Sequence, residues 1–215
     1  MKFSEYLFNE THKYWEKSTE KEFLLKMKDG TLEEDRFKTY MIQDYYYLLE
    51  YKSILETLLK LSQDDEISEF LKMAVEVTVN ETENVHIPAM RQYGITDTNN
   101  IGQGKAQVIA EYTDFYHEKI SEYGLMAGLV GLLQCSWNYA YLGKIMYERY
   151  RDEITASPYK MWFDAYTSAE YVAANDGWIE LVDKKTLDLD QEKKEALCKV
   201  FKTCAEFENR FWDAL

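Results

Sequence analysis

The sequence predicts an all-α protein, and three observations support that fold class. The 215 residues include only 2 Pro and 9 Gly, whereas an all-β chain of this length needs many more turn residues. Apolar residues make up 46% and charged residues 30%, which is the balance of a folded globular chain. Long stretches also keep the apolar spacing of amphipathic helices. We therefore expect a single-domain bundle over residues 1–215, with about seven to nine helices.

The N-terminal part divides at one clear break. Asp29-Gly30 is predicted to end a helix, and Thr31 with Glu34 has the spacing of a capping box that starts the next. From there to Leu61 the chain has neither Pro nor Gly, and its apolar residues recur about every 3.6 positions. This pattern predicts one long amphipathic helix, followed by a polar turn and cap at 62–65.

A second long helix is expected from about Glu66 to Tyr93, with Gly94 as the residue that ends it. Pro88 lies inside this helix and lacks the N–H that helix hydrogen bonding needs. We therefore expect a kink or an interruption near Val85. The polar, Gly- and Asn-rich residues 96–104 are predicted to form a loop.

The C-terminal half is also predicted to be helical. Helices are expected over about 105–123 and 125–150, with Gly124 between them. The residues Thr155 to Pro158 predict a helix start with Pro at the first helical position, and 175–177 predict a bend before that helix continues toward Lys185. A cap at 188–190 is expected to start a last helix that reaches Leu215.

The charge pattern excludes several partner classes. The net charge is -14, from 25 basic and 39 acidic residues, and no basic cluster offers a face for nucleic acid or an anionic membrane. No apolar run approaches the length of a transmembrane helix, and the N-terminus lacks the apolar stretch of a signal peptide. The 3 cysteines do not suggest a disulfide framework. We expect a cytoplasmic protein with free thiols.

Asp44 is the first candidate site residue. It follows Tyr40 by four positions and precedes Leu48 by four, so it lies on or beside the apolar face of the long helix. A carboxylate there must be paired or hydrogen-bonded, because burying it alone is costly. Tyr47 lies one turn further on. A structural salt bridge is the alternative interpretation.

Cys135 is the second candidate, at the end of a stripe of small residues. Gly124, Gly128, Gly131 and Cys135 recur at intervals of four, three and four, with Tyr139 one turn further. Glycine inside a helix costs about 1 kcal/mol relative to alanine, so three in register suggest a reason. Either the stripe opens a cavity beside a reactive cysteine, or it allows close helix packing.

Glu208 is the third candidate. It precedes Phe211 by three positions and Trp212 by four, so it shares a helix face with two large rings. A carboxylate held against rings can have a raised pKa and can act as an acid or base. The alternative is a glutamate at the rim whose carboxylate reaches solvent.

At these residues the sequence resembles the TenA family, also called thiaminase II or aminopyrimidine aminohydrolase. The matching segments keep their order along nearly the whole chain. They are Asp29-Gly30-Thr31-Leu32, Arg36-Phe37-Lys38, Gln43-Asp44-Tyr45-Tyr46-Tyr47-Leu48, Glu111-Tyr112-Thr113-Asp114-Phe115, Leu132-Leu133-Gln134-Cys135-Ser136-Trp137-x-Tyr139 with Gly143, Trp162-Phe163-Asp164-Ala165-Tyr166 and Glu208-x-x-Phe211-Trp212.

The resemblance implies a heme-oxygenase-like all-α fold, assembled as a homotetramer. It also implies hydrolysis of the C–N bond on the methylene group of a 4-amino-5-(aminomethyl)pyrimidine, and of thiamin as a second substrate. The product is the hydroxymethyl-pyrimidine that serves thiamin salvage. The resemblance implies no metal and no organic cofactor.

By the same resemblance, Cys135 matches the nucleophile and Glu208 the acid/base that handles the leaving amine. Asp44 matches the carboxylate that holds the ring nitrogen and the 4-amino group. The residues that match the aromatic cage around the flat ring are Tyr47, Tyr112, Tyr139, Tyr166 and Phe211. Gln134 departs from the pattern, since many members have proline there.

Three alternatives remain open at this point. Glu83-x-x-His86 and Asp114-x-x-His117 have the spacing of a di-metal oxidase, although such sites need further carboxylates from other helices. His12 could be a heme ligand. The chain could also be an inactive member of the family that binds a pyrimidine or a regulatory partner without turnover.

Overall fold

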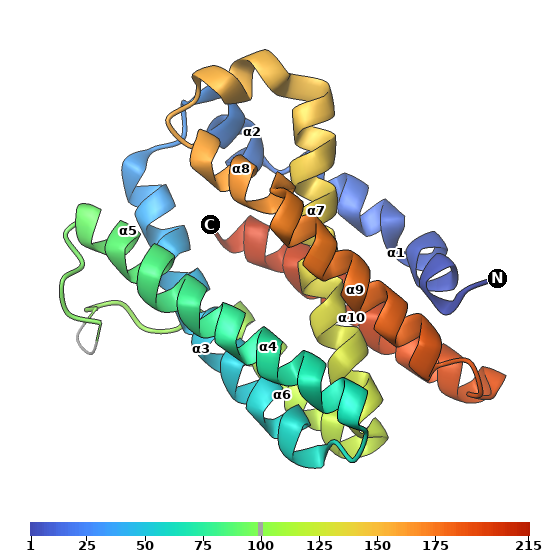
Figure 1. Cartoon of the computed structure of the whole chain (residues 1–215). Coiled ribbons are helices and arrows are strands. Elements are labelled where there is room, and N and C mark those ends of the chain that lie inside the picture. Colours follow the sequence, from blue (N-terminus) through green and yellow to red (C-terminus); the bar gives the residue numbers. More distant parts are fainter. Residues whose placement is uncertain (99–100) are drawn as a thin grey trace. The chain divides into compact units, whose positions relative to one another are not determined.

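The structure is a computed structural model that describes residues 1–98 and 101–215. Within these ranges the ordered elements are helical, which confirms the all-α prediction (Figure 1). Residues 99–100 of the predicted loop lie outside the described residues. The elements are α1 (Phe3–Thr19), α2 (Glu22–Asp29), α3 (Glu34–Leu61), α4 (Asp65–Glu81), the π-helical η1 (Thr82–His86), α5 (Ile87–Gln92), α6 (Gln107–Tyr123), α7 (Leu125–Ala156), α8 (Lys160–Thr167), α9 (Ala169–Lys185) and α10 (Gln191–Ala214).

The described residues group into two compact units. The terminal unit contains Met1–Leu32 and Leu129–Ala214, and the central unit contains Glu33–Gly128 with Leu215. The single domain expected over 1–215 stays a prediction. Among the residues that the structure describes, no helix has the length and apolar character that crossing a membrane demands.

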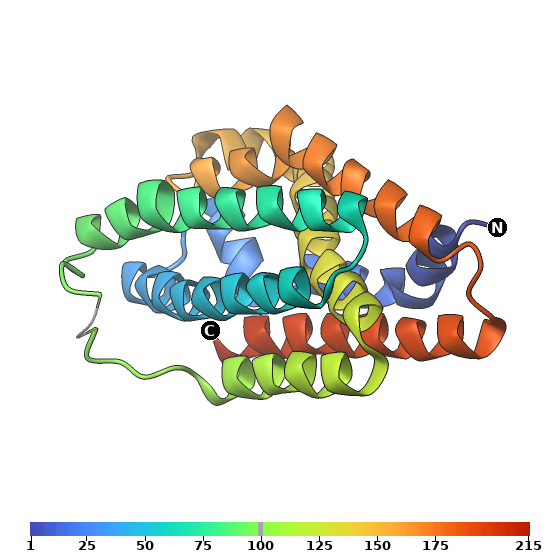
Figure 2. The same cartoon turned by 60° about the horizontal axis from the view of Figure 1, so that its bottom comes forward.

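The central unit is built around α3. Helix α4, η1 and α5 continue one another without a break and pack along α3, and α6 packs on α3 as well (Figures 1 and 2). The apolar spacing of α3 places Ile54, Leu55 and Leu58 in the core, where they are fully buried. The long amphipathic helix predicted from the sequence is therefore the scaffold of this unit.

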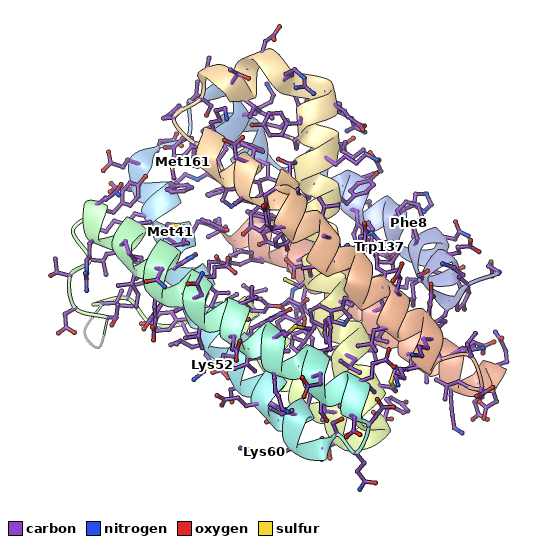
Figure 3. All side chains as sticks on the ribbon, in the orientation of Figure 1. Phe8, Met41, Lys52, Lys60, Trp137 and Met161 are labelled. Atoms are coloured by element: carbon purple, nitrogen blue, oxygen red, sulfur yellow. The ribbon has the colours of Figure 1, made fainter. Side chains whose placement is uncertain are left out.

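The terminal unit pairs the first helix with the last. Helix α1 packs on α10 and on α9, and α8 packs on α9. Trp15 and Phe201 are fully buried, with ring centroids 6.1 Å apart. Phe8 and Trp137 lie side by side at the edge of this cluster, with centroids 5.9 Å apart (Figure 3). Much of the aromatic content of the chain therefore serves packing.

Several predicted helix ends are confirmed. Gly30 has a left-handed φ of 68° and ends α2. Asp64 caps α4 by accepting a hydrogen bond from the Ile67 amide at 3.0 Å, and Asp190 accepts one from the Lys193 amide at 2.8 Å. The π-helical turn of η1 lies where Pro88 was expected to interrupt the helix.

The capping box predicted at Thr31 is wrong. The N-cap of α3 is Glu33, and no side chain caps it. The amides of Thr31 and Leu32 both donate to the carbonyl of Lys26, at 2.9 and 3.2 Å. These residues close the end of the preceding helix and so cannot begin the next.

Two predictions in the C-terminal half also need correction. Helix α7 is kinked at Tyr150, the predicted end, where the backbone is non-helical (φ -136°, ψ 38°), and a further helical segment runs to Ala156. Helix α8 begins only at Lys160, so Pro158 lies in the turn rather than at the first helical position. A further break occurs at Ser168, whose side chain caps α9 by accepting from the Tyr171 amide at 3.2 Å. Helices end here because local hydrogen bonds of serine compete with the helical pattern.

The bend predicted at 175–177 is absent, because α9 runs unbroken through it. Asn175 is buried and accepts a hydrogen bond from the Ser136 hydroxyl at 3.2 Å. This tertiary contact holds Asn175 in the helix, although its local preference is for a turn.

Candidate functional site

Asp44 lies on α3 and is buried, with 6% of its surface exposed. Its Oδ2 accepts a hydrogen bond from the Tyr40 hydroxyl at 3.3 Å and lies 3.3 Å from Nε2 of His86. Burial raises the pKa of Asp44 to about 7, and the hydrogen bond from Tyr40 opposes that rise. Among the described residues, His86 is the one ion-pair partner of Asp44.

This environment answers the salt-bridge alternative for Asp44. A structural ion pair would hold the carboxylate beside a permanent cation and lower its pKa. Here the carboxyl group has a titratable partner and a pKa shifted toward neutrality. Such strongly shifted, buried groups are concentrated at functional sites. The structural alternative for Asp44 is thus limited to its buried pair with His86, and its binding role stays a prediction.

Three tyrosines of the central unit form a hydrogen-bonded chain. The Tyr47 and Tyr116 hydroxyls are 3.2 Å apart, and Tyr116 donates to the Tyr112 hydroxyl at 2.8 Å. The rings of Tyr47 and Tyr112 are stacked, with centroids 5.5 Å apart. Because Tyr47 lies one turn from Asp44 on α3, this unit combines a carboxyl group with flat aromatic surfaces on one helix.

Cys135 lies on α7 in the terminal unit and is buried. The backbone beside it is held by α9, because the Tyr171 hydroxyl donates to the Ser136 carbonyl at 3.2 Å. Gln134 is fully buried within the same helix. A proline at 134 would lack the N–H of a helix interior, so glutamine preserves regular helix geometry next to the thiol.

An aromatic cluster of the terminal unit surrounds Tyr139, one turn after Cys135. The ring of Tyr139 lies 4.8 Å from Tyr166 and 5.8 Å from Trp212, between centroids. Trp162 lies 4.8 Å from Tyr166. Edge-on and tilted pairs at these distances stabilise the ring positions. The cluster thus holds the predicted cage residues Tyr139 and Tyr166 in fixed orientations.

Gly143 makes this cluster possible. A Cβ atom at position 143 would lie 3.0 Å from Cγ2 of Thr167 and 3.2 Å from Cβ of Tyr166. Both distances are shorter than ordinary contacts, so a side chain at position 143 would require Thr167 or Tyr166 to move by a few tenths of an ångström. The glycine of the predicted motif therefore acts by positioning Tyr166.

Glu208 lies on α10 and has 2% of its surface exposed. Phe211 and Trp212 follow it on the same helix face and are also buried, with their rings 5.5 Å apart. The alternative of a solvent-reaching glutamate at the rim is therefore wrong. A buried carboxylate among rings has the surroundings that suit a general acid or base.

The small-residue stripe has a packing explanation. A Cβ atom at Gly128 would lie 2.4 Å from Cδ2 of Leu58 and 3.0 Å from Cγ1 of Ile120, so glycine is required for close helix contact in the central unit. Gly124 lies outside α7 and ends α6, with φ of 73°. The stripe therefore does not by itself indicate a cavity.

The metal and heme alternatives receive no support from the geometry. In the first motif His86 is buried whereas Glu83 is exposed, so the two do not lie in one site; Asp114 and His117 of the second motif are both exposed. No group of three or more His, Cys, Asp or Glu side chains within residues 1–98 and 101–215 is arranged to hold a metal ion. His12 is exposed on α1.

The predicted site residues thus divide between the two units. Asp44, Tyr47 and Tyr112 belong to the central unit, and the terminal unit holds the others, which are Cys135, Tyr139, Tyr166, Glu208 and Phe211. The sequence patterns did not indicate that His86 and Glu81 lie next to Asp44, or that Trp162 packs against Tyr166. The sequence pattern that includes His86 is the Glu-x-x-His spacing of a metal site, which gives no sign of a contact with Asp44.

Comparisons with known proteins show which family this chain resembles along its length. The profile of the TENA/THI-4/PQQC family matches residues 9–215. An aminopyrimidine aminohydrolase of Helicobacter pylori is 25% identical over 99% of this chain and 98% of its own length. One from Halalkalibacterium halodurans is 26% identical, over 99% and 95%.

A solved TenA homologue from P. horikoshii OT3 superposes with a TM-score of 0.85 at 23% identity, covering 99% of this chain and 97% of the other. That likeness confirms the fold class. The profile match over residues 9–215 shows that this chain belongs to the TENA/THI-4/PQQC family.

Proposed function

We propose that this chain is an aminopyrimidine aminohydrolase. The substrate is a 4-amino-5-(aminomethyl)pyrimidine, with thiamin as a second substrate, and the product is the hydroxymethyl-pyrimidine used in thiamin salvage. The observation that carries the proposal is the likeness, along nearly the full length of both chains, to two curated relatives with that activity in their names. The buried residues Asp44, Cys135 and Glu208 provide the groups that such a reaction needs.

In this proposal Cys135 is the nucleophile. Its thiolate adds to the pyrimidine ring, the ring loses aromaticity, and the C–N bond to the exocyclic methylene breaks. Water then adds to the methylene carbon, the C–S bond breaks, and aromaticity returns. Covalent catalysis of this kind divides one difficult step into two easier ones. The net change replaces the amine with a hydroxyl group and releases ammonia.

Glu208 and Asp44 take the proton-transfer and binding roles. Glu208 gives a proton to the departing amine and later accepts one from water, as a positioned carboxyl group can. Asp44 holds the 4-amino group and the adjacent ring nitrogen, for which a carboxyl group offers complementary hydrogen bonds. The proposed aromatic cage for the flat ring consists of Tyr47, Tyr112, Tyr139, Tyr166 and Phe211.

Ammonia release tests the proposal. Purified protein is incubated with the aminomethyl-pyrimidine and, separately, with thiamin, and ammonia and the hydroxymethyl product are measured. Turnover of the aminomethyl-pyrimidine supports the proposal. Saturable binding without turnover would instead support the alternative of an inactive pyrimidine-binding or regulatory member. Added chelator should leave the rate unchanged, since no cofactor is invoked.

The proposal also includes a cytoplasmic homotetramer of single-domain subunits. The family resemblance carries the tetramer. Light scattering coupled to size-exclusion chromatography would measure the mass of the assembly, which should be about four times the 25.5 kDa of one chain.

A further inference from the structure

Asp44 has two ionisable neighbours on the helix that packs along α3. Nε2 of His86, in η1, lies 3.3 Å from Oδ2 of Asp44. Glu81, the last residue of α4, interacts electrostatically with both Asp44 and His86. The sequence separates these residues by about forty positions, so only the packing of α4 and η1 against α3 creates the cluster.

The π-helical turn explains how His86 is held. Residues Thr82–His86 form the wide turn, and Pro88 follows within the next helix. His86 also makes a hydrogen bond to the backbone of Met41 on α3. Such π-helical turns inside α-helices often occur at functional sites. One side of the imidazole is thus anchored to α3 while Nε2 faces Asp44.

The two oxygens of Asp44 have different surroundings. Both polar contacts that Asp44 makes within the described residues, to Tyr40 and to His86, involve Oδ2. Nε2 of His86 is buried and has no aligned hydrogen-bond partner in the described part of the chain. A buried polar nitrogen in that state is costly, and a proton between Nε2 and Oδ2 would satisfy it.

We propose that His86 is a positioning residue for Asp44, and that Nε2 and Oδ2 share one proton. Oδ1 of Asp44 then remains a hydrogen-bond acceptor whichever of the two atoms carries that proton. An acceptor at Oδ1 suits the edge of an aminopyrimidine, because the 4-amino group donates, and the adjacent ring nitrogen also donates when it carries a proton. The inference rests on the proposed function for its ligand, and it adds a residue that does not itself touch the substrate.

The electrostatics of the cluster are consistent with a shared proton. Burial lowers the pKa of His86, against the opposing effects of Glu81 and of the hydrogen bond to Met41. Burial and the charge of Asp44 raise the pKa of Glu81 to about 7. These shifts favour neutral forms, so the cluster holds few net charges near pH 7. The titratable groups that face His86 are Asp44 from α3 and Glu81 from α4.

The kinetic test compares His86→Gln with Glu83→Gln, an exposed residue of the same turn. In His86→Gln we expect KM for the aminomethyl-pyrimidine to rise about ten- to hundredfold with a smaller change in kcat, because ground-state orientation is lost. In the plot of kcat/KM against pH, the change on the acid side should follow the titration of a single carboxyl group. Glu83→Gln should match wild type. A folded His86→Gln protein with the wild-type KM and pH profile would overturn the inference.

A spectroscopic test does not depend on turnover. In ¹⁵N-labelled wild-type protein, the Nε2 resonance of His86 should lie between its protonated and unprotonated positions, and in Asp44→Asn it should move to the unprotonated position. If both proteins show the same Nε2 resonance, no proton is shared and the inference fails, whatever the activity. If the resonance moves but wild type releases no ammonia, the proposed function fails while the shared proton stands.

Discussion

Asp44 and Glu208 both carry buried carboxyl groups, but they lie in different units and have different neighbours. Asp44, in the central unit, faces the ionisable side chains of His86 and Glu81 and the hydroxyl of Tyr40. Glu208, in the terminal unit, shares its helix face with the rings of Phe211 and Trp212. The neighbours of Asp44 thus include ionisable groups, and those of Glu208 include two large rings.

This difference teaches how one fold can separate two chemical tasks. The proposed task of Asp44 is to hold the edge of the substrate ring, which depends on the hydrogen bonds its carboxyl group can make. The proposed task of Glu208 is proton transfer, which a positioned carboxyl group can perform. Substitutions in each unit test this division of tasks.

Cys135→Ser should have the largest effect. Serine keeps the shape of the side chain but is a far weaker nucleophile, so turnover should fall by more than about a thousandfold while ligand binding and thermal stability change little. Ammonia release and thermal melting measure the two effects. Cys198→Ser, at a buried position on α10, is the matched control and should keep its activity. Near wild-type turnover in Cys135→Ser would remove covalent catalysis from the proposal.

Glu208→Gln should reduce turnover by about 10²–10⁴-fold, because glutamine keeps the volume but cannot transfer a proton. The pH profile of kcat should lose one limb. Glu206→Gln changes an exposed residue of the same helix and should leave the rate unaltered. Equal rates for the two variants would show that Glu208 serves packing alone.

Asp44→Asn should abolish most activity and change the pH dependence of stability. The pKa of Asp44 in the folded protein, about 7, lies above its ordinary value of 3.8. The contribution of this group to wild-type stability is therefore fully present below pH 3.8 and is lost as pH rises toward 7, where the folded carboxyl group must ionise. Asparagine does not ionise, so Asp44→Asn should not lose stability in this way.

The free energy of unfolding of Asp44→Asn minus that of wild type should be larger, in favour of the variant's folded state, by about 1–3 kcal/mol at pH 8 than at pH 5. Chemical denaturation at both pH values measures it. Asp114→Asn changes an exposed residue of the central unit and should show no such difference. A large loss of stability at both pH values, with activity kept per folded molecule, would return Asp44 to a structural role.

Gly143→Ala should have the smallest effect, and on the terminal unit only. The added methyl group must displace Thr167 or Tyr166, so we expect a loss of about 1–3 kcal/mol in stability and a rise of a few fold in KM. Gly177→Ala is the matched control, because a Cβ atom there meets nothing within 4 Å. That control should gain about 0.5–1 kcal/mol, since alanine favours the helix.

Local sequence was enough to predict most of the helices. Apolar spacing, Gly30, Pro88 and Asp190 correctly indicated the long helix α3, the end of α2, the interruption at η1 and the start of α10. These signals work because they depend on backbone geometry and on side chains within a few residues. The helical periodicity also placed Asp44 and Glu208 on apolar faces, and both are buried.

Tertiary contacts decided what the local signals misjudged. Asn175 stays helical because Ser136 bonds it from another helix, and Thr31 does not cap because its amide closes α2. Likewise, no local pattern could place His86 against Asp44, since that distance arises from the packing of η1 on α3. The sequence alone determined the helices and the chemically able side chains. The surroundings of Asp44, and hence its raised pKa, depended on burial and on helix packing that brings distant parts of the chain together.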